Sequence, residues 1–219
     1  MRERWRPATF LPRLPGLLVG LVLFGIGIAL MALSGLGLGP WEAFHQGLGN
    51  HLGVPLGTIA VALGIPILAL WWPLGERPGI GTLINVLLIG TSTNVGLTFL
   101  PAATGVPAQL AEVLTGIVVI AIGSGLYLAA DLGPGPRDGL MTGLHHRFGW
   151  SIRRARTAVE LTVLVLGYLL GGTIGLGTVL FALGIGPLVE VFLGVFDREG
   201  RVSRRERAVI GEPGSMPGE

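Results

Sequence analysis

Six apolar stretches, each about as long as a membrane-crossing helix, dominate this sequence. They lie near residues 14–34, 56–74, 79–100, 107–130, 152–170 and 174–195. A helix rises about 1.5 Å per residue, so about 20 apolar residues cross a bilayer core of roughly 30 Å. Half of the chain is hydrophobic and only 13% is charged, about half the charged share of a soluble protein. The pattern predicts an all-α polytopic membrane protein with six transmembrane helices.

Arginine sets the expected orientation. All fifteen basic residues are arginine, and six spans place all of them on one side of the membrane. Positive residues favour the cytoplasmic side, so both termini are expected in the cytoplasm. We divide the chain into an N-terminal tail (1–13), a single transmembrane domain (14–195) and an arginine-rich, disordered C-terminal tail (196–219). This topology accounts for the excess of arginine, so nucleic-acid binding is not expected.

The chain also matches itself at an offset of 96 residues. Nine glycines coincide at this offset. The other matches include Pro40 with Pro136, Thr82 with Thr178, and Glu42 with Asp138. We interpret residues 14–100 and 107–195 as two copies of one unit. Each copy holds three spans, so the second is expected upside down relative to the first. Many transporters use such an inverted repeat, with the substrate near the bilayer midplane between the copies.

Two matched corners carry the expected chemistry: "GLGPWEAF" at 37–44 and "GPGPRDGL" at 133–140. Proline suits the first helical position, which predicts short helices over 40–52 and 136–149. Glycine allows φ > 0 and a close approach of backbone to a bound group. A helix N-terminus adds free N–H donors and partial positive charge, which suits an anion.

Two interpretations of these corners stay open. Glu42 and Asp138 lie in first helical turns, where the helix dipole alone favours an acid. The short helices are then ordinary interfacial helices. Alternatively they form a re-entrant pair in which both acids act in coupling or gating. Arg137, beside Asp138, is expected to favour the ionised form of that carboxyl.

Three further polar positions need partners. Glu160 lies about 10 Å along the helix from Arg153, and Arg156, four residues earlier, is its expected partner in a desolvated ion pair. This pair fits a structural clamp or a proton or ion role. Asn85 shares a helix face with Ser92 and fits interhelical hydrogen bonding or a polar cavity.

The candidate substrate or ion-binding residues are Gly37, Gly39, Glu42, Asn85, Gly133, Gly135, Arg137, Asp138, Arg156 and Glu160. No metal site is expected from the four histidines, which are assigned to headgroup contact. The five tryptophans lie near span ends and are assigned as interfacial anchors. No enzyme signature and no cofactor motif occurs.

Four motifs resemble the bacterial YczE/YitT group of integral membrane proteins: "GLGPWEAFHQGL", "LGERPGIGTLINVLLIG", "GPGPRDGLMTGL" and "LGGTIGLGTVLFALGIGPL". The resemblance covers about residues 14–195. It implies a multi-pass plasma-membrane protein and carries over no catalytic residue, because the activity of the group is mostly unassigned.

The leading hypothesis is therefore transport of a small solute, with an anion and proton coupling as the favoured form. The alternative is a non-transporting membrane scaffold or regulatory partner that associates through its glycine-rich faces. The lipid bilayer is the expected surrounding, and homodimerisation is left open.

Overall fold

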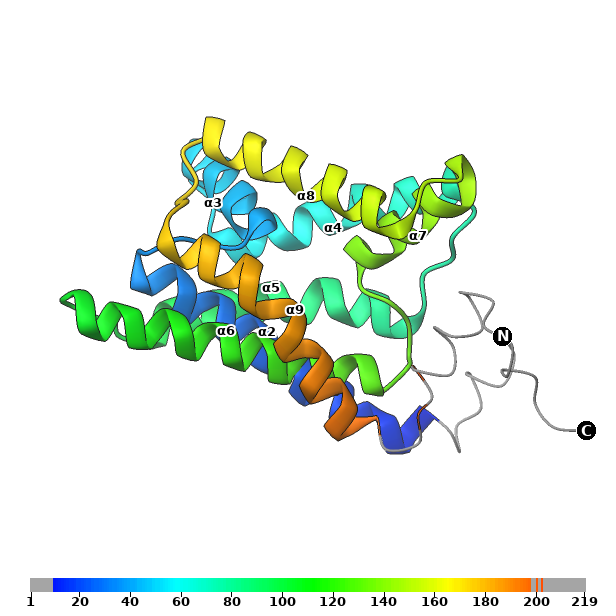
Figure 1. Cartoon of the computed structure of the whole chain (residues 1–219), viewed down its shortest axis with the longest axis horizontal. Helices are drawn as coiled ribbons and strands as arrows, with labels where there is room; N and C mark the ends of the chain where they lie inside the picture. The colour runs from blue at the N-terminus through cyan, green and yellow to red at the C-terminus, as the bar shows by residue number, and fades with distance from the viewer. Residues whose placement is uncertain (1–9, 198–199, 201, 203–219) are drawn as a thin grey trace, which may run out of the picture.

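The fold of the chain is entirely helical in the computed structural model, which describes residues 10–197, 200 and 202 (Figure 1). The helices are η2 (Leu11–Arg13), α2 (Leu14–Ser34), α3 (Pro40–Leu52), α4 (Leu56–Leu74), α5 (Ile80–Phe99), α6 (Val106–Ala129), α7 (Pro136–Phe148), α8 (Ile152–Leu169) and α9 (Leu176–Phe196). All six predicted spans form helices within two residues of their expected bounds. The short helices open at Pro40 and Pro136, as predicted. Most of the two predicted tails lies outside the described residues.

Five helices of the described chain are long and apolar enough to cross a membrane: α2, which continues from η2, and α4, α5, α6 and α9. The expected sixth, α8, forms at its predicted place but is not among them. Its first half carries Arg153, Arg154, Arg156 and Glu160, whereas residues 161–169 are apolar apart from one threonine. The described chain therefore has five candidate spans by length and composition, one fewer than the six that the sequence predicts.

The centre of the molecule is the long contact between α2 and α6. A Cβ added at Gly20 would lie 2.7 Å from the carbonyl oxygen of Gly123, and one at Gly27 would lie 2.7 Å from that of Gly116. These glycines let the two backbones touch, which is how helices associate closely in lipid. α5 packs on the outside of α2, and α9 packs on the outside of α6.

The short helices lie toward opposite ends of the molecule, α3 on the left and α7 on the right of Figure 1. Each packs against the neighbouring long helices, α3 against α8 and α4, and α7 against α4 and α8. Trp71 of α4 is fully buried, and its indole N–H donates to the carbonyl oxygen of Pro136 at 3.0 Å. Trp41 is also buried, so its assignment and that of Trp71 as interfacial anchors are wrong. The assignment fits Trp72, which is 89% exposed.

Two antiparallel helix pairs differ in how they close. α4 packs on α5 near the start of α4, where Asn94 Oδ1 accepts a hydrogen bond from the Gly57 amide at 2.9 Å. Asn94 Nδ2 also donates to Thr58 Oγ1 at 2.9 Å. α8 and α9 are joined by a short connection but do not pack along their lengths, and Figure 1 shows them diverging from that connection.

Candidate functional site

The first turns of α3 and α7 meet inside the protein. Arg137 Nη2 of α7 lies 2.7 Å from Glu42 Oε1 of α3, and the two side chains are 28% and 6% exposed. The Arg137 guanidinium carbon also lies 5.1 Å from the centre of the Trp41 ring, within cation–π range. These two residues are 95 positions apart in sequence, and their opposite charges hold them together in a mostly buried environment. Glu42 and Arg137 are candidate residues from the two different corners, and the structure brings them into contact.

One face of α3 carries buried polar atoms without hydrogen-bond partners in the described structure. They are Trp41 Nε1, Glu42 Oε1, His45 Nδ1 and His45 Nε2. The Glu42 contact with Arg137 is an ion pair by distance, without the alignment of a hydrogen bond. Buried polar groups are normally hydrogen-bonded, so these atoms are unused donors and acceptors that a ligand group or water would satisfy.

His45 belongs to this face and not to the headgroup region that the sequence suggested. It is 3% exposed. Burial, with the charge of Arg137 as a smaller contribution, lowers the pKa of His45 from 6.5 to about 3. The imidazole is therefore neutral at physiological pH and offers one donor and one acceptor. A signal was available in the sequence, since His45 follows Glu42 and Trp41 by three and four residues on one helix face.

Asp138 lies at the matching position of α7 but makes different contacts. The Tyr127 hydroxyl of α6 approaches Asp138 Oδ2 at 3.4 Å, and the backbone of Gly135 hydrogen-bonds to the carboxylate. Desolvation raises the pKa of Asp138 above 3.8, and the positive charges of Arg156 and Arg137 only partly oppose this effect. Arg137 lowers the pKa of Asp138, as expected, but desolvation outweighs both arginines, and the guanidinium of Arg137 pairs with Glu42.

The side chain of Asp138 nevertheless remains accessible. An accessible carboxyl that is protonated more readily than an ordinary aspartate is suited to accepting and releasing a proton. The sequence did not single out Tyr127, which is 8% exposed and lies in the last turn of the apolar helix α6.

Both acids also serve their own helices. Each occupies the third helical position, and a Cβ added at the N-cap glycine would lie 2.5 Å from Glu42 Oε2 or 3.1 Å from Asp138 Oδ2. An acid at this position reaches back to the N-cap backbone and complements the helix dipole. The structure therefore combines this ordinary role with the ion pair between the helices.

The remaining glycine candidates hold the corners in place. Gly37 and Gly133 have φ of 124° and 134°, as expected for the corners. Their close approach is to protein: an added Cβ would lie 2.7 Å from Thr178 Oγ1 or 2.8 Å from Thr82 Oγ1. These two glycines thus fasten each corner to the start of α9 or α5, and the hypothesis that they present donors directly to a solute loses support.

Asn85 is buried and lies near the second corner. A Cβ on Gly135 would be 3.7 Å from Asn85 Nδ2 and 3.6 Å from the Tyr127 hydroxyl. Asn85, Tyr127 and Asp138 therefore gather around Gly135, which fits the polar-cavity alternative for Asn85.

Arg156 and Glu160 meet, as predicted, with Nε 2.9 Å from Oε1. Their side chains are 60% and 36% exposed, so no packed helix of the described chain buries this pair. Exposed pairs contribute little to stability, typically about 0–1 kcal/mol. Arg156 still acts on Asp138 through its charge.

An apolar cavity of about 520 Å³ lies beside the ion pair. It is an open pocket between α3, α4, α7 and α8, and its lining includes Trp41, Phe44, Ile67, Leu140, Trp150 and Val163. Trp41 connects the two features, because its ring lines the cavity and faces Arg137. This volume is within the range of small-molecule sites.

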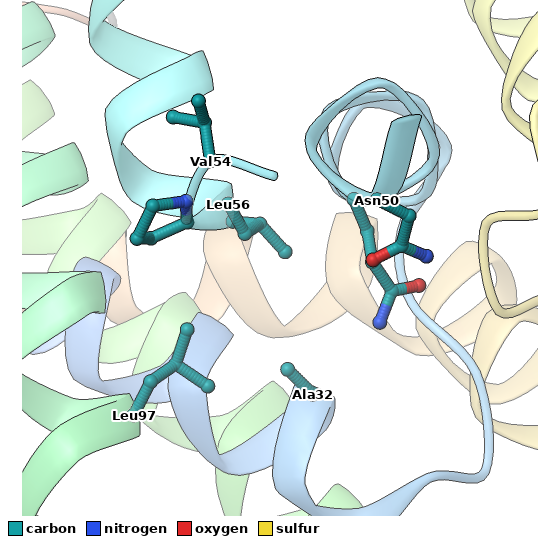
Figure 2. A pocket seen from close by; sticks show the side chains of 7 residues that line it. Ala32, Asn50, Val54, Leu56 and Leu97 are labelled. Atoms are coloured by element: carbon teal, nitrogen blue, oxygen red, sulfur yellow. The ribbon is translucent and has the colours of Figure 1, made fainter. Parts of the chain in front are cut away.

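A second cavity, of about 240 Å³, lies between the end of α2 and the start of α4 (Figure 2). Figure 2 shows Ala32 and Leu97 facing the amide of Asn50 across the gap. Gln46 also lines it, but its Oε1 already accepts a hydrogen bond from the Thr173 amide at 2.7 Å. No charged side chain of the described chain lines this cavity. Nor do the described residues include a cluster of three or more histidine, aspartate or glutamate side chains that could hold a metal ion.

Comparison with known proteins identifies the family of this chain. Residues 11–194 match the model of a family of unknown function, DUF6198. The chain belongs to this family. In this DUF6198 chain, α3 and α7 meet through Glu42 and Arg137.

Its relatives are bacterial. An uncharacterized protein of Haemophilus influenzae is 40% identical over 83% of this chain and 84% of its own length. The uncharacterized membrane protein YczE of Bacillus subtilis is 34% identical over 89% and 92%. The uncharacterized protein YyaS of the same organism is 27% identical over 82% and 92%. The predicted resemblance to YczE is confirmed, and the chain is a multi-pass membrane protein. No solved structure matches it significantly.

Proposed function

We propose that this DUF6198 protein is a secondary transporter of a small organic anion, built as an inverted repeat of two three-span units. The observation that carries the proposal is the buried contact between Glu42 and Arg137 at the converging starts of α3 and α7, beside an apolar cavity. No catalytic step is proposed.

Matching geometry in the two halves supports the repeat. When 96 is added to the residue numbers, the bounds of α3 become those of α7. The bounds of α4 become those of α8, except that α8 ends one residue earlier. The contacts match as well: the amide of Gly81 donates to Leu132 O at 3.1 Å, and that of Gly177 donates to Leu36 O at 2.7 Å. Each bond joins one half to the other, so the units interlock.

Three crossings in each half support the inverted orientation. In Figure 1 the α4–α5 and α7–α8 connections lie at the right end, and the α5–α6 and α8–α9 connections lie at the left. At the right end, His146 Nδ1 in the last turn of α7 lies 2.9 Å from Glu76 Oε1 in the α4–α5 connection. We infer that α8 is the sixth span, with its arginines at the right-hand end. The arginine-bearing end is then cytoplasmic and so are both termini.

The ion pair favours re-entrant over interfacial helices. Two interfacial helices on opposite sides would be separated by a hydrocarbon core of roughly 30 Å. The 2.7 Å contact between Glu42 and Arg137 requires both first turns to lie at the same depth. Their N-terminal dipoles then point to a common centre, as in transporters with broken helices.

Local chemistry suggests the kind of solute. Arg137, the indole N–H of Trp41 and neutral His45 offer positive charge and donors. The adjoining cavity offers aromatic and aliphatic surface. An anion with an apolar body uses both. Asp138, accessible and protonated more readily than an ordinary aspartate, supplies the coupling proton.

The test is transport by purified protein in liposomes. Entry of one monovalent anion together with one proton moves no net charge, so transport is recorded as uptake of radiolabelled probe under an inward proton gradient. The probes are benzoate, phenylacetate, lactate, phosphate and chloride. We expect uptake of the aromatic carboxylates, loss of uptake in Glu42→Gln and in Asp138→Asn, and retained uptake in Glu76→Gln, whose carboxylate lies at the end of the bundle. Absence of uptake with every probe, in folded wild-type protein, would favour the scaffold alternative.

A further inference from the structure

The two halves of the molecule differ in one helix–helix contact, which the first half has and the second half lacks. α4 and α5 are packed together, whereas their counterparts α8 and α9 are not. None of the most apolar 18-residue stretch of α9 is buried. One face of α9 and one face of α8 therefore lack a protein partner within the described chain.

The residues that would fill this contact are complementary. At the offset of 96, Gly57 and Thr58 correspond to Arg153 and Arg154, and Asn94 corresponds to Glu190. The hydrogen bonds that join Asn94 to Gly57 and Thr58 are thus replaced, in the second half, by one acid and two arginines. Glu190 is exposed on an apolar helix, and no ion pair links it to any described residue.

The glycine at this crossing is repeated too. A Cβ on Gly90 would lie 2.3 Å from the carbonyl oxygen of Gly57, so Gly90 permits the close approach of α4 and α5. Its counterpart Gly186 has no atom within 4 Å of an added Cβ. Gly186 and Glu190 are four residues apart and share one face of α9. Like the packed face of α5, this face of α9 carries a glycine with a polar residue four positions later. No atom of the described chain lies within 4 Å of a Cβ added at its glycine.

We propose that α8 closes onto α9 in a second conformation, in which Glu190 pairs with Arg153 or Arg154 across Gly186. This gate rests on the proposed inverted repeat. In the described conformation the start of α4 is closed against the end of α5, at the left of Figure 1. The start of α8 and the end of α9 stand apart at the arginine-bearing right-hand end. Exchange of the two contacts opens the central site to the other side of the membrane. α8 is the chosen occupant of the bare α9 face because its charge is opposite to that of Glu190.

Disulfide crosslinking tests the gate, and the chain is suited to it because it contains no cysteine. Thr157 corresponds to Val61, whose side chain comes within 2.5 Å of a Cβ added at Gly90. The pair Thr157→Cys and Gly186→Cys is therefore expected to form an intramolecular disulfide in membranes treated with copper phenanthroline. The matched control is Thr157→Cys with Leu188→Cys, since Leu188 faces the core cluster of α2 and α6.

The charges provide the second readout. In the crosslinking pair, Glu190→Arg is expected to slow disulfide formation at least about tenfold by repulsion, and the further changes Arg153→Glu and Arg154→Glu are expected to restore it. Equal rates of disulfide formation in all three proteins would refute the pairing of Glu190 with Arg153 or Arg154. Absence of the disulfide in folded protein would overturn the closure, and a disulfide between two chains would assign the α9 face to a second copy.

Failure of the gate is distinguishable from failure of transport. Proton-driven uptake in liposomes without the α8–α9 disulfide would leave the central site as proposed but reject this motion. A charge-dependent disulfide without any uptake would establish the closure and reject the transporter.

Discussion

Replacement of Arg137 by methionine would leave the Glu42 carboxylate buried without its cation. The Glu42 side chain is 6% exposed and Arg137 is 28% exposed. Removal of one partner from a buried pair typically costs about 3–5 kcal/mol. Because Arg137 is partly exposed, we expect the lower end, about 3 kcal/mol. For a chain of this size that corresponds to a fall in melting temperature of roughly 6–12 °C.

The protein supplies its own control for this experiment. Arg156 and Glu160 form an ion pair of nearly the same length, but their side chains are 60% and 36% exposed. Arg156→Met should therefore cost less than about 1 kcal/mol. The double variant Glu42→Gln, Arg137→Met should recover more than half of the loss from Arg137→Met, because no uncompensated charge remains.

The measurement is the fraction of purified protein that stays monodisperse by size-exclusion chromatography after heating in one detergent. Equal melting temperatures for Arg137→Met and Arg156→Met would refute the reasoning that burial gives the Glu42–Arg137 pair its weight. Additive losses in the double variant would show that the two side chains do not interact.

Three further predictions concern topology, packing and pH. Reporters fused after residues 52 and 149 should report the outside and the cytoplasm respectively, and a result on the same side would contradict the inverted repeat. Gly139→Ala should destabilise by about 1–3 kcal/mol, because its Cβ would overlap the ring of Trp71, whereas Gly186→Ala, with nothing within 4 Å, should melt like the wild type. The raised pKa of Asp138 means that the folded protein retains a proton which the unfolded chain releases, so stability should fall as pH rises from 3.8 through the raised pKa, and less so in Asp138→Asn. A melting curve of equal pH slope in both proteins would contradict this assignment.

Much of the helical framework could be predicted from the chain alone. Apolar runs of about 20 residues permit few alternatives to helices, because a membrane leaves no solvent for unpaired backbone groups. Pro40 and Pro136 marked the starts of the short helices, since proline fixes φ and lacks the N–H that a first turn leaves unused. The spacing of Arg156 and Glu160 predicted their contact, because residues four apart face each other on any helix.

The centre of the site depended on tertiary structure. Sequence placed Arg137 beside Asp138, but the fold turns its guanidinium to Glu42, 95 residues away. Neighbours along the chain say little about burial, so the ionisation of Asp138, the interior position of Trp41 and the dry setting of His45 could not be read from local pattern. Burial is a property of the packed helices, and it also decided which of two ion pairs is screened by solvent. The sequence by itself determined where helices begin, which segments match and which side carries positive charge, because these follow from local geometry and composition. Only the packing of α3 and α7 against the long helices decided which polar groups meet.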